Sequence, residues 1–246
     1  MSRVSVITGG GSGVGRALAQ RLAEAGHCVM VVGRRREALE DTAAGHTDIE
    51  PLAADVSTAA GRDAIVAAVG DRRVRFLVHN AGVLTPVGPL SEVTLDEWRH
   101  SQAVNVEAPL FLTQALLGAL AEGRVLHVSS GAAHRAMPGW GAYCTSKAAL
   151  YRMYTVLRDE LREQGVAVGS VRPGVVDTDM QALIRAQSAE DFPAVERFRA
   201  LKAQGELEPP ERVAAFIEAL LTRTDPERFG AEEWDIRDHA RVFDLD

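Results

Sequence analysis

The chain has 246 residues, enough for one α/β domain with a full hydrophobic core and close to the upper limit for a single core. Its formal net charge of −7 argues against a surface that binds nucleic acid. The first residues enter an apolar run without a charged leader, and no apolar run approaches the length that spans a membrane.

Two cysteines, Cys28 and Cys144, fall in an expected strand and an expected helix. We therefore expect two buried thiols rather than a disulfide. Together with the missing leader, this predicts a protein of the reduced cytoplasm without nucleic-acid or membrane partners.

Strand and helix patterns alternate along the first half of the chain. A helix is expected over residues 13–26, because Leu18 and Leu22 recur at helical spacing and Gly26 can end it. Short apolar runs predict four buried strands, at residues 3–7, 28–33, 49–53 and 75–79.

The alternation continues in the second half. Strands are expected at residues 125–128, 166–171 and 234–236, and helices at residues 94–122, 143–164 and 211–221. Residues 181–207 are mixed helical and charged, with little sustained apolar face. The pattern predicts one α/β domain over residues 1–246, a doubly wound parallel sheet with helices on both faces and right-handed crossovers.

A glycine-rich segment, GGGSGVG, joins the first strand to the first helix. Glycine at positions 9, 13 and 15 lets the backbone turn tightly and approach a pyrophosphate at the helix N-terminus. A Walker loop is excluded, because Arg16 and Ala17 stand where that loop needs Lys and Ser or Thr.

The end of the second strand predicts the type of dinucleotide. NAD-binding proteins place an acid there, about 20 residues after the glycine loop, for the ribose 2′-hydroxyl. This chain has Gly33 followed by Arg34, Arg35 and Arg36. Since guanidinium groups grip a 2′-phosphate that a carboxylate would repel, we expect NADP(H).

The segment SSGAAHRAMPGWGAYCTSKAA, which begins at Ser129, predicts the catalytic chemistry. Tyr143 and Lys147 are four residues apart, so a helix presents both on one face. An ammonium one turn away should stabilise the phenolate and pull the tyrosine pKa toward neutral pH. Ser130 ends the preceding strand, and its hydroxyl can hold the same carbonyl oxygen that Tyr143 protonates. No metal site is expected, because His79 has no second histidine at metal spacing.

The chain resembles the classical short-chain dehydrogenases/reductases over nearly its whole length. The matching residues are Thr8-Gly9-x-x-x-Gly13-x-Gly15, Asn80-Ala81-Gly82, Asn105, Ser130, Tyr143-x-x-x-Lys147 and Pro173-Gly174. The resemblance implies a Rossmann-type fold and four catalytic residues, Asn105, Ser130, Tyr143 and Lys147. Asn105 would bend its helix and hold a water that feeds protons to the lysine.

The resemblance also implies a set of cofactor-binding residues. Asp55 would meet the adenine amino group, Val56 would cover the ring, and Asn80 would tie neighbouring strands together. The full set is Gly9, Ser12, Gly13, Val14, Gly15, Arg34, Arg35, Asp55, Val56, Asn80, Ala81, Gly82, Tyr143, Lys147, Pro173, Gly174, Val176 and Thr178.

Two further stretches narrow the subgroup. GWGAYC around Tyr143 and PGVVDTDMQ after the sixth strand resemble sepiapterin reductases and the related bacterial benzil reductases. This implies an NADPH-dependent carbonyl reductase for vicinal diketones, α-hydroxy ketones or pterin side chains, with a substrate lid at residues 174–208. Ser130, Tyr143, Trp140 and Met180 would contact the substrate. Asp235 either holds the edge of a pterin or is a solvated acid of the tail.

Alternatives remain at this stage. The same site would serve an alcohol dehydrogenase working oxidatively, and a dinucleotide-binding regulator without catalysis is a second possibility. The resemblance further implies a homodimer, or a tetramer, in which the helices of residues 94–122 and 143–164 pair across subunits. The candidate contacts are Leu110, Phe111, Ala148 and Tyr151.

Overall fold

The computed structural model describes residues 2–245. Its centre is a seven-stranded sheet in the order β3-β2-β1-β4-β5-β6-β7, in which every pair of neighbours is parallel. The strands are β1 (Arg3–Thr8), β2 (Val29–Gly33), β3 (Ile49–Ala53), β4 (Arg73–His79), β5 (Arg124–Val128), β6 (Ala167–Arg172) and β7 (Glu233–Asp235). This order confirms the predicted doubly wound parallel sheet.

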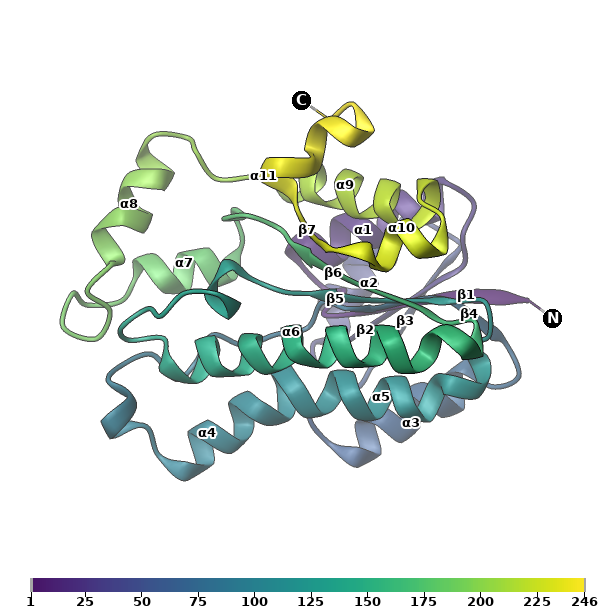
Figure 1. The fold of residues 1–246 in the computed structure, drawn as a ribbon, viewed down its shortest axis with the longest axis horizontal. Helices are drawn as coiled ribbons and strands as arrows, with labels where there is room; N and C mark the ends of the chain where they lie inside the picture. The colour runs from purple at the N-terminus through teal and green to yellow at the C-terminus, as the bar shows by residue number, and fades with distance from the viewer. Residues whose placement is uncertain (1, 246) are drawn as a thin grey trace.

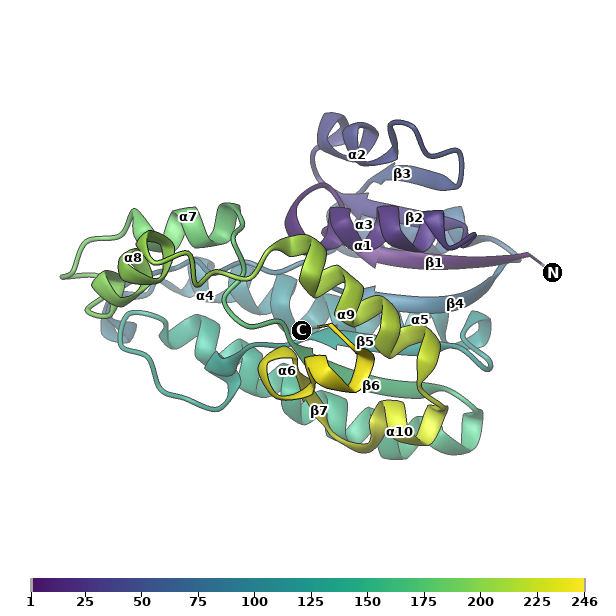
Figure 2. The same ribbon diagram turned by 90° about the horizontal axis from the view of Figure 1, so that it is seen from above.

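Helices cover both faces of the sheet, as Figures 1 and 2 show. One face carries α1 (Gly13–Glu24) and α9 (Pro210–Arg223), with α2 (Arg36–Ala43) near the β3 edge. The other carries α3 (Ala59–Val69), α5 (Ala108–Leu116) and α6 (Gly141–Leu161). Side chains alternate between the faces along each strand. In β1, for example, Val4 and Val6 belong to the core under α3 and α5, whereas Ile7 belongs to the core under α1.

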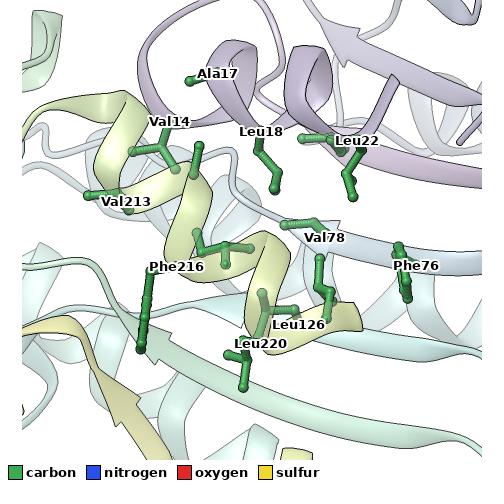
Figure 3. Packing of buried hydrophobic residues seen from close by; sticks show 14 of the residues in the cluster. Val14, Ala17, Leu18, Leu22, Phe76, Val78, Leu126, Val213, Phe216 and Leu220 are labelled. Atoms are coloured by element: carbon green, nitrogen blue, oxygen red, sulfur yellow. The ribbon is translucent and has the colours of Figure 1, made fainter. Parts of the chain in front are cut away.

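The core under α1 and α9 forms because each helix presents one apolar stripe. Leu18 and Leu22, four residues apart on α1, lie with Phe216 and Leu220 of α9 over the strand residue Val78 (Figure 3). All five side chains are fully buried. This packing fixes the start of α1, and therefore the glycine loop, against the end of β1.

Two helices lie beyond the carboxyl end of the sheet, α7 (Asp179–Arg185) and α8 (Val195–Ala203) (Figure 1). The sequence predicted no sustained apolar face here, but the structure differs. Phe192, Val195 and Phe198 are buried in a third core cluster together with Trp140 and Tyr143. Helical spacing in the sequence did not reveal this apolar face, because Phe192 lies in the turn between the two helices.

The helix expected over residues 94–122 is a composite. It consists of α4 (Leu95–Gln102), a π-helical turn at Ala103–Glu107, α5 and a 3₁₀ turn at Leu117–Ala119. Thr94 caps α4 through a capping box with Glu97. The π turn contains Asn105, the residue at which the sequence predicted a bend.

Several smaller expectations need correction. Cys28 precedes β2 rather than lying in it, and its side chain is exposed, so the predicted buried thiol is wrong. Cys144 is half-buried, and both cysteines are free. Helices α3, α10 (Pro226–Ala231) and α11 (Ile236–His239) lie where the sequence patterns predicted no helix. Across residues 2–245, no helix combines the length and the apolar character needed to cross a membrane.

Candidate active site

The candidate site lies at the carboxyl edge of the sheet, where β1 and β4 are neighbours. The chain leaves β1 toward one face and β4 toward the other, so a crevice opens between the two connections. The glycine loop follows β1, and Asn80-Ala81-Gly82 follows β4. The tertiary structure thus brings together the two motifs expected to hold a dinucleotide.

The glycine loop has no room for larger side chains. Gly9 and Gly13 have positive φ angles of +68° and +52°, which favour glycine. A Cβ atom on Gly15 would lie 2.3 Å from the carbonyl oxygen of Gly9. This close approach leaves backbone N–H groups at the start of α1 as the lining of the crevice, which fits the pyrophosphate of a dinucleotide.

Asn80 ties the ends of β1 and β4 together. Its side-chain amide donates to the carbonyl oxygens of Thr8, at 3.0 Å, and Gly9, at 3.1 Å. The hydroxyl of Thr8 in turn accepts from the backbone N–H groups of Asn80 and Ala81, both at 3.1 Å. These four bonds hold the glycine loop over the crevice.

Basic and acidic residues follow β2 and β3, where the adenosine end of a dinucleotide is expected. Arg34 and Arg35 are exposed, and Arg35 forms an ion pair of 3.9 Å with Asp179 at the start of α7. The carboxylate of Asp55 accepts from the backbone and hydroxyl of Ser57, at 2.9 and 2.7 Å. Burial alone would raise the pKa of Asp55, but the Ser57 bonds and the nearby Arg34 charge lower it. Asp55 therefore accepts hydrogen bonds as a carboxylate.

Tyr143, Lys147 and Ser130 meet at the end of β5. Helix α6 presents Tyr143 and Lys147 on its buried face, with exposed fractions of 6% and 5%. The Tyr143 hydroxyl is hydrogen-bonded to Ser130. The Lys147 ammonium donates to the carbonyl oxygen of Val128 at 2.8 Å and lies 5.8 Å from the centre of the Tyr143 ring.

The electrostatics of this group differ from the sequence prediction. Burial raises the pKa of Tyr143 to about 12, although the Ser130 hydrogen bond acts in the opposite direction. Burial also lowers the pKa of Lys147 to about 8, partly offset by the charge of Glu233. The predicted lowering of the Tyr143 pKa by Lys147 is therefore wrong, because burial raises this pKa and Lys147 is not among the groups that shift it. Tyr143 is a protonated phenol at neutral pH, which suits a proton donor.

Asn105 is buried, and its side chain forms three hydrogen bonds to protein groups. The amide nitrogen donates to the Val83 carbonyl at 2.9 Å and to the Ser146 hydroxyl at 3.0 Å. The amide oxygen accepts from the Val83 backbone at 2.9 Å. Asn105 therefore locks the chain after β4 onto α6, beside Lys147. The water expected at this residue stays a prediction.

Trp140 lies with Tyr143 in the third core cluster, and Met180 is partly buried against that cluster. The indole of Trp140 meets the Tyr143 ring edge-on, with centroids 5.8 Å apart, and stacks on Phe192 at 4.6 Å and 8°. Phe192 and Phe198, which both contact Trp140, are residues of this cluster that the sequence did not single out. Their only signal was the presence of two aromatic residues in an otherwise charged segment.

Asp235 requires a correction, because it is neither a pocket-rim carboxylate nor a solvated acid. Its side chain is fully buried, forms ion pairs with Arg237 and, at 3.2 Å, with Arg172, and caps α11. The pairing of β7 with β6 places Asp235 directly beside Arg172. Burial would raise its pKa, but the bonds from Arg237 lower it. The carboxylate is thus committed to two guanidinium groups.

The remaining predicted residues lie after β6. Gly174 has a φ of +77°, and a Cβ there would approach Glu208 and Ile236 at 3.3 Å. Thr178 lies against the glycine loop, since a Cβ on Gly13 would be 2.9 Å from its methyl group. The segment that leads from β6 to α7, which includes Pro173 and Val176, therefore closes one side of the crevice.

Comparison with known proteins agrees with this architecture. Residues 3–189 match the short chain dehydrogenase family. The chain belongs to the short-chain dehydrogenases/reductases, a family of oxidoreductases, and is an oxidoreductase of that family.

Individual relatives narrow the subgroup. A benzil reductase ((S)-benzoin forming) of Bacillus subtilis is 32% identical over 225 residues, covering 89% of this chain and 93% of the relative. A sepiapterin reductase of Meriones unguiculatus is 36% identical over 227 residues, covering 83% of this chain and 85% of the relative. A short-chain dehydrogenase/reductase structure from Saccharomyces cerevisiae has a TM-score of 0.89 at 28% identity and covers 98% of both chains.

Two similar structures contain nicotinamide dinucleotides. A 3-ketoacyl-(acyl-carrier-protein) reductase from Brucella melitensis, complexed with NADH, has a TM-score of 0.81 at 25% identity, covering 95% and 96% of the chains. A metagenomic short-chain oxidoreductase complexed with NADP has a TM-score of 0.71 at 27% identity, covering 95% of this chain and 94% of the other. Because one of these structures contains NADH and the other NADP, they do not decide between the two cofactors for this chain. Its cofactor preference has to be judged from its own residues.

Lys147 has a testable effect on stability. Its folded-state pKa of about 8 lies below the ordinary 10.5, so the buried charge destabilises the folded protein fully below pH 8. The penalty fades as the pH rises from 8 toward 10.5, because the folded lysine loses its proton before the unfolded one. Lys147→Met should therefore raise the free energy of unfolding at pH 7 by about 1–3 kcal/mol, and by less at about pH 9.5.

Urea denaturation at the two pH values measures both differences. Lys202→Met is the matched control, because Lys202 is exposed on α8 and pairs with Asp177 at the surface. A Lys147→Met protein less stable than the unmodified one at pH 7 would contradict the prediction.

Proposed function

We propose that the protein is an NADPH-dependent carbonyl reductase that reduces one ketone of a vicinal diketone to an alcohol. The observation that carries the proposal is the position of Tyr143 on the buried face of α6, beside Ser130 and Lys147 and within an aromatic cluster. The family membership and the benzil reductase relatives support the same reaction class.

The residues divide the chemistry among them. When bound, the nicotinamide supplies a hydride to the ketone carbon. Ser130 donates a hydrogen bond to the ketone oxygen, and Tyr143 transfers its phenolic proton to that oxygen as the charge develops. Lys147 lies beside the resulting phenolate and stabilises it. Asn105 holds the segment after β4 and α6 in place around them.

Cofactor binding is assigned to the crevice between the β1 and β4 connections. The glycine loop holds the pyrophosphate at the start of α1, and Asp55 and Val56 take the adenine. Arg34, with Arg35 beside it, binds the 2′-phosphate, because β2 ends in Gly33 without an acid. These placements make NADPH the preferred donor.

Substrate choice follows from the aromatic cluster. Trp140 lies against Tyr143, Met180 packs against the same cluster, and the segment of residues 174–208 covers this region as a lid. A pterin would need a carboxylate anchor, but Asp235 is committed to Arg172 and Arg237. An aromatic diketone needs no such anchor, so it fits the site better than a pterin side chain. The two free thiols agree with a reducing compartment, and we place the protein in the cytoplasm.

The proton donor is tested by Tyr143→Phe. The change keeps the ring in the aromatic cluster and removes the hydroxyl, so NADPH binding should survive. Turnover of benzil, followed as NADPH oxidation, should fall by about 10²–10⁴, the usual scale for a positioned acid. Tyr151→Phe on the same helix is the control and should retain full activity. A Tyr143→Phe enzyme with most of its activity would require another proton donor.

The cofactor preference is tested by Arg34→Ala. Loss of a charge-assisted phosphate contact, worth about 1.5–3 kcal/mol, should weaken NADPH binding at least about tenfold. NADH binding should stay nearly unchanged. Titration of cofactor fluorescence measures both, and Arg36→Ala is the control, because Arg36 pairs with Glu40 on α2. Equal affinity of the unmodified protein for the two cofactors would refute the assignment.

We further propose a homodimer that pairs α5 and α6 with their copies in a second subunit. Phe111 is 43% exposed on α5, with Leu110 half-buried beside it. On α6, Ala148 is exposed and Tyr151 half-buried. Burying such an apolar surface favours association.

Light scattering at micromolar concentration tests the assembly. It should give twice the chain mass, and Phe111→Arg should shift the mass toward one chain. Leu183→Arg, at an exposed leucine on α7, should leave the dimer intact. A monomeric mass for the unmodified protein would disprove the dimer.

A further inference from the structure

Trp140 carries a polar atom that the fold leaves without a partner. Its side chain is 5% exposed, and its Nε1 has no hydrogen-bond acceptor within residues 2–245. The comparison within the same protein is Trp234, whose Nε1 donates to the Phe229 carbonyl at 3.1 Å. Since an N–H group removed from water without an acceptor is destabilising, the unpaired Nε1 of Trp140 needs an explanation.

The position of Trp140 supplies one. Its indole lies between the catalytic tyrosine and the lid, edge-on to Tyr143 at 5.8 Å and stacked on Phe192 at 4.6 Å. The surrounding side chains of this cluster are apolar, among them Leu84 and Phe198. The Trp140 ring is thus the neighbour of the Tyr143 ring, and its Nε1 is an unpaired donor beside the residue to which the ketone oxygen is assigned.

We infer that Trp140 determines specificity, with its Nε1 donating a hydrogen bond to the second oxygen of a vicinal dicarbonyl whose first oxygen is held by Tyr143 and Ser130. The inference rests on the proposed function and identifies the second carbonyl oxygen as the substrate feature that the site recognises. A dicarbonyl offers one oxygen to Tyr143 and Ser130 and the other to the Trp140 Nε1, whereas a monoketone leaves the indole N–H buried and without an acceptor. Sites built to bond a substrate group discriminate strongly against analogues that lack it.

A pair of ketones isolates this contact. Benzil has two adjacent carbonyls, and deoxybenzoin has a methylene in place of one of them. Trp140→Phe retains an aromatic ring and removes the N–H. We expect kcat/KM for benzil to fall about tenfold in Trp140→Phe, while kcat/KM for deoxybenzoin changes by less than about twofold.

Two other variants control for packing. Trp234→Phe makes the same change at an indole that already has an acceptor, so it should leave the ratio of the two kcat/KM values unaltered. Trp140→His keeps a ring N–H and should retain the preference for benzil better than Trp140→Phe. Circular dichroism verifies that each variant is folded.

The outcomes separate the inference from the proposed function. Equal losses on both ketones, or no loss on benzil, would overturn the role of Trp140 and leave the reductase proposal standing. If the unmodified protein turns over neither ketone with NADPH, the proposed function fails. Calorimetry of the two ketones on the NADP⁺ complex then tests Trp140 directly, and an unchanged benzil affinity in Trp140→Phe would overturn the inference.

Discussion

The burial of the Lys147 ammonium at the carboxyl edge of an apolar sheet is the constraint on which the site depends. A charge removed from water is destabilising unless fixed dipoles replace the solvent. The Val128 carbonyl at the end of β5 supplies one such dipole, and Asn105 holds the adjoining segment against α6. Even so, burial lowers the pKa of Lys147 to about 8. The protein thus gives up stability to keep a cation beside Tyr143.

A row of polar side chains crosses the sheet beneath this site. The β-sheet register aligns His79, His127, Ser170 and Glu233 on four consecutive strands. His79 is bonded to Thr113 at 2.8 Å, and Ser170 donates to Glu233 at 3.0 Å. Burial, together with the Lys147 charge, lowers the pKa of His127 to about 3. Burial also lowers the pKa of His79 well below its ordinary value, so both histidines are neutral and add no positive charge under the ammonium.

The crevice at the glycine loop and the aromatic cluster around Trp140 share one connecting segment. Thr178 lies against Gly13 of the glycine loop, and the next residue, Asp179, pairs with Arg35. The same segment leads into α7, whose Ile184 is buried with Trp140 and Phe192. Exposed ion pairs contribute little, so the apolar contacts hold α7 and α8 in place. The glycine loop and the α7–α8 region are in this way joined by one continuous segment with contacts to both.

The sequence by itself determined the features that depend on local spacing. The order of strands and helices, the glycine turn and the shared face of Tyr143 and Lys147 follow from backbone periodicity and conformational freedom. Only the tertiary structure decided what surrounds each of the important side chains. The pairing of Asp235 with Arg172 depends on the register of β7 against β6. Phe192, which stacks on Trp140, lies in a turn, where apolar residues follow no regular spacing. The Tyr143 pKa is likewise set by burial rather than by the lysine four residues away. Burial is a sum over neighbours distant in sequence, which local spacing does not encode.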